Sequence, residues 1–239
     1  MTHIRILSYN IHGGRSLDGT RDVRRIHAVM ERLDIDIAIF QEMETRPSNR
    51  GSLKDEELLA GEDRPHRLRG KTLEEKDGWY GNFLVSRFPI RQGLVHNLET
   101  HEDLEPRNAL DAIIDTPLGA MRFIGTHLSL SYLERFWEAR NLLRLMQEVE
   151  QETTAPLFLL GDINEWQPHS KLIRHLNSAM IALPCKATFP AFAPIFKLDR
   201  VWHDTPKDFQ VSAHRMSGRG FRTLSDHLPL VIEIRSAQR

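Results

Sequence analysis

Hydrophobic and polar residues alternate along much of the chain in a way that predicts β-strands. Residues 4–10 and 35–40 follow this pattern. Between them, apolar residues recur at helical spacing at Val23, Ile26, Val29, Met30 and Leu33. Further strands are predicted at residues 83–86, 93–95, 109–115, 121–127, 157–160, 186–189, 198–202, 209–214 and 228–234. The chain therefore begins as strand, helix and strand, and continues mostly in strands.

Helices are predicted to be few. A long one begins near Tyr132, where an apolar stripe starts, and residues 45–77 show no regular period. We predict that residues 45–77 form a long surface excursion, which either shapes the substrate pocket or is a mobile insertion without a functional role. Many strands with short connections favour an α/β protein in which sheets pack on each other. No repeat or linker divides residues 1–239, which are predicted to form a single domain.

Composition narrows the class of protein. The chain is 40% hydrophobic and 27% charged, as is typical of soluble globular proteins, and its net charge of -1 argues against a broad basic surface. Cys185 is the single cysteine, which excludes an internal disulfide and a cysteine-rich zinc site. The sequence shows neither a signal peptide nor a membrane-spanning run, so we expect a cytoplasmic protein. The oligomeric state has no signal in the sequence.

Several predicted strands end in, or are preceded by, residues that can bind a metal or transfer a proton. These residues are Asn10, Glu42, His127, Asp162 with Asn164, Asp199, and Asp226 with His227. Each alone also fits a turn residue, a helix cap or a hydrogen-bonded histidine. Because packed sheets bring strand ends to one rim, their joint occurrence predicts an active site there. Oxygen ligands favour Mg²⁺, with Mn²⁺ as the alternative, and imidazoles supply acid or base, a combination that suits phosphate-ester hydrolysis.

These segments resemble the endonuclease/exonuclease/phosphatase superfamily. The matching segments are Ser8-Tyr9-Asn10, Gln41-Glu42, Tyr80-Gly81-Asn82, Pro106-Arg107-Asn108, Thr126-His127-Leu128, Gly161-Asp162-Ile163-Asn164, Leu198-Asp199-Arg200-Val201 and Ser225-Asp226-His227. Each is short, but together they follow the family order over nearly the whole chain. The resemblance implies a four-layer α/β/β/α sandwich, with two mixed β-sheets face to face, helices on the outer faces and the active site at one rim.

The resemblance also implies roles for single residues. The implied metal ligands are Glu42, Asn10 and Asp226, and the implied phosphate-binding residues are Asn82, Arg107 and Asn108. The implied catalytic residues are His227, Asp199, Asp162, Asn164 and His127. Among them, His227 would be a general base or would hold the scissile phosphate, and the resemblance leaves open which histidine is the base.

Asp199 is expected to be the hydrogen-bond partner of His227. A carboxylate that accepts one ring N–H selects the tautomer and leaves the other ring nitrogen facing water or phosphate. Asp226 is expected to serve the metal instead, because adjacent residues of a strand point to opposite sides.

The predicted function is metal-dependent hydrolysis of a phosphodiester of a small or lipid-like molecule. The slightly negative net charge disfavours duplex binding, which needs many phosphate contacts. Residues 161–166 resemble the sphingomyelinase-like and bacterial branches, and residues 9–14 resemble the bacterial branch. The alternative is a nuclease acting on DNA or RNA, and a third reading, an inert binding module, is disfavoured by the full set of acids and both histidines. Candidate residues for binding a nucleic-acid strand are Arg15, Arg21, Arg24, Arg25 and the stretch 64–71, although the cluster at 21–25 fits the solvated face of a helix better. Trp79 and Trp166 either stack on the substrate or pack beneath the sheets.

Overall fold

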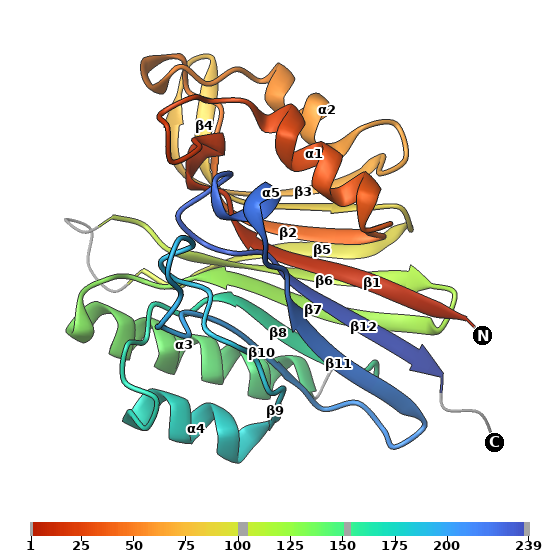
Figure 1. Ribbon diagram of the computed structural model, residues 1–239. Helices are drawn as coiled ribbons and strands as arrows, with labels where there is room; N and C mark the ends of the chain where they lie inside the picture. Colours follow the sequence, from red (N-terminus) through yellow and green to blue (C-terminus); the bar gives the residue numbers. More distant parts are fainter. Residues whose placement is uncertain (1, 100–104, 151–153, 237–239) are drawn as a thin grey trace.

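Two six-stranded mixed β-sheets pack face to face between outer helices (Figure 1). The computed structural model describes residues 2–99, 105–150 and 154–236. The first sheet has the order β11-β12-β1-β2-β4-β3 and the second the order β5-β6-β7-β8-β10-β9. β1 and β2 are parallel, as are β7 and β8, and the other pairs are antiparallel. The predicted four-layer sandwich is confirmed.

The strands have the following bounds. The first sheet contains β1 (His3–Asn10), β2 (Ile37–Glu44), β3 (His66–Glu75), β4 (Gly78–Ser86), β11 (Phe209–Arg215) and β12 (Leu230–Ser236). The second contains β5 (Ile90–Asn97), β6 (Asn108–Thr116), β7 (Gly119–His127), β8 (Leu157–Asp162), β9 (Ile181–Ala182) and β10 (Asp199–His203).

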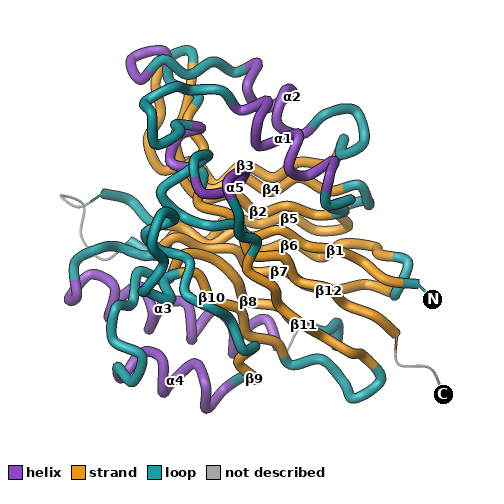
Figure 2. Tube along the Cα trace, viewed as in Figure 1, coloured by secondary structure: helices purple, strands orange, loops and turns teal. Residues whose placement is uncertain are grey.

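Helices cover the outer face of each sheet, as the purple segments of Figure 2 show. The first sheet is covered by α1 (Val23–Arg32) and α2 (Lys54–Ala60), and the second by α3 (Tyr132–Glu150) and α4 (Lys171–Ala179). The short helices are η1 (His12–Gly14), η2 (Pro47–Asn49) and α5 (Arg219–Arg222). α1 begins at Asp22, whose side chain accepts a hydrogen bond from the Arg24 N–H, so this end is capped. None of the helices in the described ranges is both long and apolar enough to cross a bilayer.

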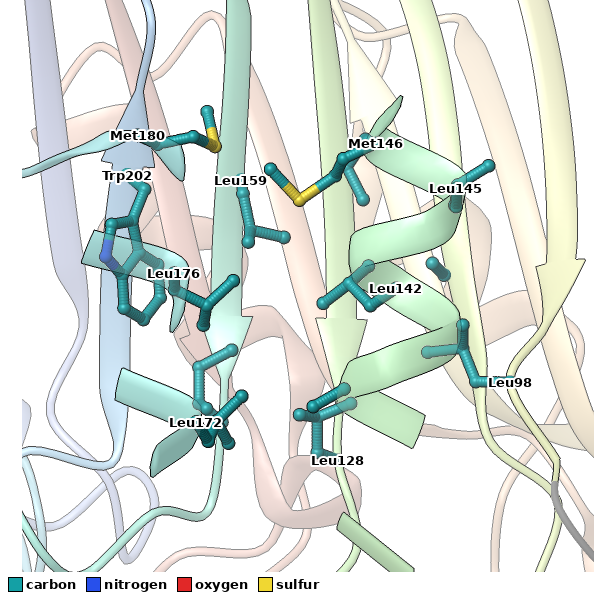
Figure 3. Packing of buried hydrophobic residues seen from close by; sticks show 14 of the residues in the cluster. Leu98, Leu128, Leu142, Leu145, Met146, Leu159, Leu172, Leu176, Met180 and Trp202 are labelled. Carbon is teal, nitrogen blue, oxygen red and sulfur yellow. The ribbon is translucent and has the colours of Figure 1, made fainter. Parts of the chain in front are cut away.

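Three buried clusters lie between the four layers. In β1, Ile4 and Ile6 face the second sheet, whereas Leu7 and Tyr9 face α1. This is the alternation that the sequence pattern predicts. The third cluster, between the second sheet and its helices, includes Trp202 (Figure 3). The two sheets are thereby held at a constant separation, which fixes the strand ends relative to one another.

Two sequence predictions about secondary structure were wrong. Residues 186–189 form no strand, because Thr188 bonds instead to Leu228 and to Phe196, and only an isolated bridge joins Phe189 to Phe196. Residues 45–77 are not an irregular excursion, since they contain η2, α2 and β3. β3 is an edge strand whose exposed positions carry charged residues, and this hides the apolar alternation by which strands are recognised.

Candidate active site

Strand register brings the predicted residues to one end of the sandwich. In the first sheet, Asn10 at the end of β1 is level with Gln41, the neighbour of Glu42. In the second sheet, Asp162 at the end of β8 is level with both His127 of β7 and Asp199 of β10. The two sheets therefore deliver their polar ends to a common rim, as predicted.

Glu42 is directed by an irregularity in β2. The pairing of β2 with β4 shifts register between Phe40 and Met43, and Glu42 within this bulge has a φ of 58°. A positive φ is unfavourable for residues other than glycine, and residues with such backbone strain cluster at functional sites. His12 (φ 49°) and Asn164 (φ 52°), which also lie at this rim, have the same unfavourable backbone geometry.

Asn10 joins the carboxylates of the two sheets. Its Nδ2 donates to Glu42 Oε1 at 2.9 Å and to Asp162 Oδ2 at 3.0 Å. Its Oδ1 accepts from the His12 N–H at 3.1 Å, which determines the orientation of the amide. Asn10 therefore presents nitrogen, not oxygen, to both carboxylates.

His227 and Asp199 form a buried pair. His227 Nδ1 and Asp199 Oδ2 are 2.8 Å apart, so the predicted hydrogen bond is present. The reason given for assigning Asp226 to the metal instead was wrong, because Asp226 and His227 lie in a bend before β12 and not within a strand. Burial opposes the charged form of His227, but the carboxylates of Asp199 and Asp162 outweigh it and raise the pKa of His227 to about 10. The imidazole is therefore protonated at neutral pH.

His127, unlike His227, is in its neutral form at pH 7. Burial lowers the pKa of His127 to about 4, although the nearby Asp162 carboxylate opposes this. Asn164 Nδ2 donates to the Leu128 carbonyl at 2.7 Å and is 3.1 Å from His127 Nε2, so this ring nitrogen accepts. His127 is neutral at pH 7, and the environments of the two histidines therefore separate their pKa values across the neutral range.

The acid stability of the protein is expected to depend on His127. In the unfolded chain the imidazole takes up a proton below its ordinary pKa of 6.5, whereas in the folded chain it does so only near 4. Folding stability is therefore lost as the pH falls between these values, by up to about 3 kcal/mol. In urea denaturation with EDTA, His127→Gln should show a shallower loss than wild type between pH 7 and pH 4. Exposed His214→Gln is the control, and parallel pH curves for His127→Gln and wild type would contradict the assignment.

Asp162 lies between the two imidazoles. Its Oδ2 is 3.5 Å from His227 Nε2 and 3.6 Å from His127 Nε2, and its Oδ1 accepts from the Asn164 N–H at 3.0 Å. The preceding Gly161 is required by space, since a Cβ there would lie 2.0 Å from the Thr126 carbonyl oxygen. Gly161 thus allows β8 to approach β7 closely enough to place Asp162 beside His127.

Two groups of side chains can hold a divalent ion. The first is Glu42 with Asp226, whose Oδ1 is 3.4 Å from His12 Nδ1. Burial raises the pKa of Glu42, the hydrogen bond from Asn10 opposes this, and the charge of Asp226 adds to it. The second group is Asp162, Asp199 and His227, whose ligand atoms lie within 4.8 Å of one another. In the second group Asp199 and His227 already bond to each other, which leaves fewer free lone pairs for an ion.

A pocket of about 280 Å³ opens over these residues. Its wall includes the predicted residues Asn10, Glu42, Arg107, His127, Asp162, Asn164, Asp226 and His227. Asn82 and Asn108 do not belong to this wall, since Asn82 Nδ2 donates to Asn108 Oδ1 at 3.0 Å and the pair is buried between β4 and β6.

The sequence reasoning missed part of the pocket wall. Tyr80, Glu105, Leu130, Phe189 and Leu198 contribute to it. Only Tyr80 and Leu198 lie within the matching motifs, and Glu105 lies just before one. Of the two tryptophans considered, Trp166 lines the pocket, whereas Trp79 is buried and donates to Glu56.

The arginines considered for nucleic-acid binding are mostly bound within the protein. Arg21 is paired with Asp55 at 2.8 Å, Arg24 with Asp22 at 2.8 Å and Arg64 with Glu31 at 2.7 Å. Arg25 donates to Ser16, while Arg15 contacts a backbone carbonyl and lines a neighbouring pocket. The side chains of Arg21 and Arg64 are only 13% and 0% exposed, whereas Arg15 and Arg24 face solvent.

A model of the endonuclease/exonuclease/phosphatase family matches residues 7–227. The structure is similar to an endonuclease/exonuclease/phosphatase from Beutenbergia cavernae DSM 12333 (TM-score 0.75, 23% identity, covering 99% of this chain and 72% of that one). It is also similar to the mannosyl-6-phosphatase Bt3783 of Bacteroides thetaiotaomicron VPI-5482 (TM-score 0.75, 19% identity, covering 97% of this chain and 99% of that one). A third similar structure is the human nocturnin catalytic domain with bound sulfate (TM-score 0.74, 19% identity, covering 98% of this chain and 93% of that one). A search among proteins with curated descriptions found no match.

Proposed function

Because this chain belongs to the endonuclease/exonuclease/phosphatase family, we propose that it hydrolyses a phosphodiester of a small or lipid-like molecule with a divalent metal ion. Members of this family are phosphoesterases. The observation that carries the proposal is the position of Asp162 between a protonated and a neutral imidazole, beside the carboxylates of Glu42 and Asp226. Such an arrangement suits attack of water on a phosphate ester.

Glu42 and Asp226 would hold the ion. Their oxygen donors suit Mg²⁺, with Mn²⁺ as the alternative, and the raised pKa of Glu42 reflects burial and neighbouring negative charge that a dication relieves. The bound ion would offset negative charge on the phosphoryl oxygens. We assign Asn10 to orienting Glu42 and Asp162, since its amide nitrogen faces both of them.

The remaining residues divide the proton chemistry between them. Asp162 accepts the proton of the attacking water, and Asn164 holds the neighbouring His127 as a hydrogen-bond acceptor. His227, kept protonated by Asp199, donates to a phosphate oxygen and stabilises the charge that develops there. Arg107, which lines the same pocket, adds a second cationic donor.

The pocket supports a small or lipid-like substrate over a nucleic acid. Its volume of about 280 Å³ fits a compact phosphate ester, and Leu130, Trp166 and Phe189 give it an apolar wall. The ion pairs of the little-exposed Arg21 and Arg64 lower the positive charge available to a polynucleotide.

The test is a panel of phosphate esters assayed with Mg²⁺, Mn²⁺, Ca²⁺ or EDTA. The panel holds bis(4-nitrophenyl) phosphate, glycerophosphodiesters, sugar phosphates, DNA and RNA. EDTA should abolish hydrolysis of small phosphodiesters, and Mg²⁺ should restore it. Glu42→Gln should raise the Mg²⁺ concentration needed for half-maximal rate by about 10–100-fold, which is the effect of perturbing a metal site. Exposed Glu148→Gln is the matched control. Salt-sensitive cleavage of DNA without activity on small phosphodiesters would instead identify a nuclease.

A further inference from the structure

Seven large apolar side chains are exposed in three segments that border the catalytic pocket. They are Leu130 just before α3, Tyr132, Leu133 and Trp137 at the start of α3, Trp166 after β8, and Phe192 and Ile195 before β10. We call this set the apolar collar. It contains more than half of the large apolar residues that are exposed in the described part of the chain.

Side-chain contacts join the three segments of the apolar collar. Arg135 donates to the Leu130 carbonyl at 2.9 Å, and its Nε lies 3.6 Å from a carboxylate oxygen of Glu165, the neighbour of Trp166. The Trp166 ring packs edge-on against Phe189 and Phe196, with centroids 5.7 and 4.7 Å apart. These two phenylalanines are the ends of the loop that carries Phe192 and Ile195. The apolar collar is therefore continuous with the pocket wall.

The high exposure of the side chains in the apolar collar indicates a surface that binds a partner. Phe192 is 64% exposed, Ile195 70% and Leu133 68%, so these side chains add little to the core. Apolar residues gathered beside a pocket mark an interaction surface, whereas singly scattered ones do not. Cations border the apolar collar, since the Arg140 guanidinium lies 4.8 Å from the Trp137 ring centroid and Lys197 is exposed next to Phe196.

We propose that the apolar collar docks this protein on a lipid bilayer, so that the catalytic pocket opens onto phospholipid head groups. The proposal rests on the phosphodiesterase function proposed above. Leu, Ile and Phe side chains gain free energy by leaving water for the acyl region, while tryptophan and bordering cations suit the head-group level. A pocket of about 280 Å³ can take a phosphorylated head group while the acyl chains remain in the bilayer.

Tryptophan fluorescence can report docking directly. Trp137 and Trp166 are 49% and 39% exposed, whereas Trp79 and Trp202 are buried and serve as an internal constant background. On addition of phosphatidylcholine vesicles with phosphatidylglycerol, emission should shift to shorter wavelength. Lipids brominated in the acyl chains should quench it. Vesicle co-sedimentation measures affinity in parallel.

The double variant Phe192→Ser, Ile195→Ser should weaken vesicle binding by about a hundredfold, because it removes two large apolar side chains from the contact. Ile181→Ser is the matched control. Ile181 is 58% exposed, but it pairs with His203 at the end of β10 opposite to Asp199. This control should bind vesicles as wild type does.

Three results would overturn the lipid proposal. The first is wild-type protein that neither shifts its emission nor sediments with vesicles. The second is equal vesicle affinity of the double variant and Ile181→Ser. Dimers that dissociate in the double variant, without vesicle binding, would assign the apolar collar to a second copy of the chain and also overturn it. Hydrolysis of bis(4-nitrophenyl) phosphate needs no lipid, so an active protein that ignores vesicles refutes only the docking proposal. Vesicle binding without any hydrolysis refutes only the proposed function.

Discussion

Replacing Asp162 with asparagine is expected to lower kcat for a small phosphodiester by about 10³-fold. The amide keeps the shape of the side chain but cannot accept the proton of the attacking water. Asp162 is buried and touches Asn10, Asn164 and both imidazoles, so no neighbouring carboxylate has equivalent contacts. Steady-state kinetics at saturating Mg²⁺ measures the effect.

Asp115→Asn provides the control for this substitution. Asp115 lies near the far end of β6, where it pairs with Arg91, so its loss should leave kcat unchanged. Thermal unfolding of both variants separates catalysis from folding. An Asp162→Asn enzyme that retains more than about a tenth of wild-type kcat would remove Asp162 from the role of proton acceptor.

A double-mutant cycle on Asp199 and His227 is expected to be strongly non-additive. His227→Gln should lower kcat by about 10²–10³-fold, because the protonated donor to the phosphate is lost. Asp199→Asn should have a smaller effect of the same kind, since Asp199 acts by orienting and charging His227. Adding Asp199→Asn to His227→Gln should then change kcat little further.

The pH profile distinguishes a positioning role for Asp199 from a merely structural one. In wild type His227 keeps its proton up to a pKa of about 10, so activity should persist well above neutral pH. Without the Asp199 carboxylate the pKa of His227 should be lower than in wild type, because burial still opposes the charged imidazole while only Asp162 and Asp226 still favour it. The alkaline loss of activity should therefore begin at a lower pH. An alkaline limb that does not move in Asp199→Asn would show that Asp199 does not control the charge of His227.

Local sequence patterns were sufficient to predict the strands and helices whose apolar residues recur at a regular spacing. β1 and α1 were predicted from apolar spacing, and α3 was located by its apolar stripe. β3 was missed, because an edge strand faces water and carries charge where a central strand carries apolar residues. Residues 186–189 were assigned to a strand, yet Thr188 there donates to Asp199 and so supports the pair with His227. Local alternation cannot distinguish a sheet hydrogen bond from one that supports a site.

The candidate site was likewise predicted in part: some of its residues were identified from the sequence and others were not. Polar residues at strand ends, together with a family resemblance, identified Glu42, Asp162 and His227, and the pocket contains all three. Asn82 and Asn108 were implied by the resemblance alone, and they lie in a buried pair outside the pocket wall. Leu130 and Trp166 also line the pocket, and their place in its wall depends on how α3 and the loop after β8 are positioned, which local sequence patterns do not show.

The sequence by itself determined the periodicity of the strands, the residue types at their ends and the family to which the chain belongs, because these follow from neighbouring residues and motif order. Only the tertiary structure decided the opposite protonation of His127 and His227, the orientation of Asn10 and the exposure of the apolar collar. Each of these depends on burial and on charges contributed by strands far apart in the chain, and those distances exist only once the two sheets have packed.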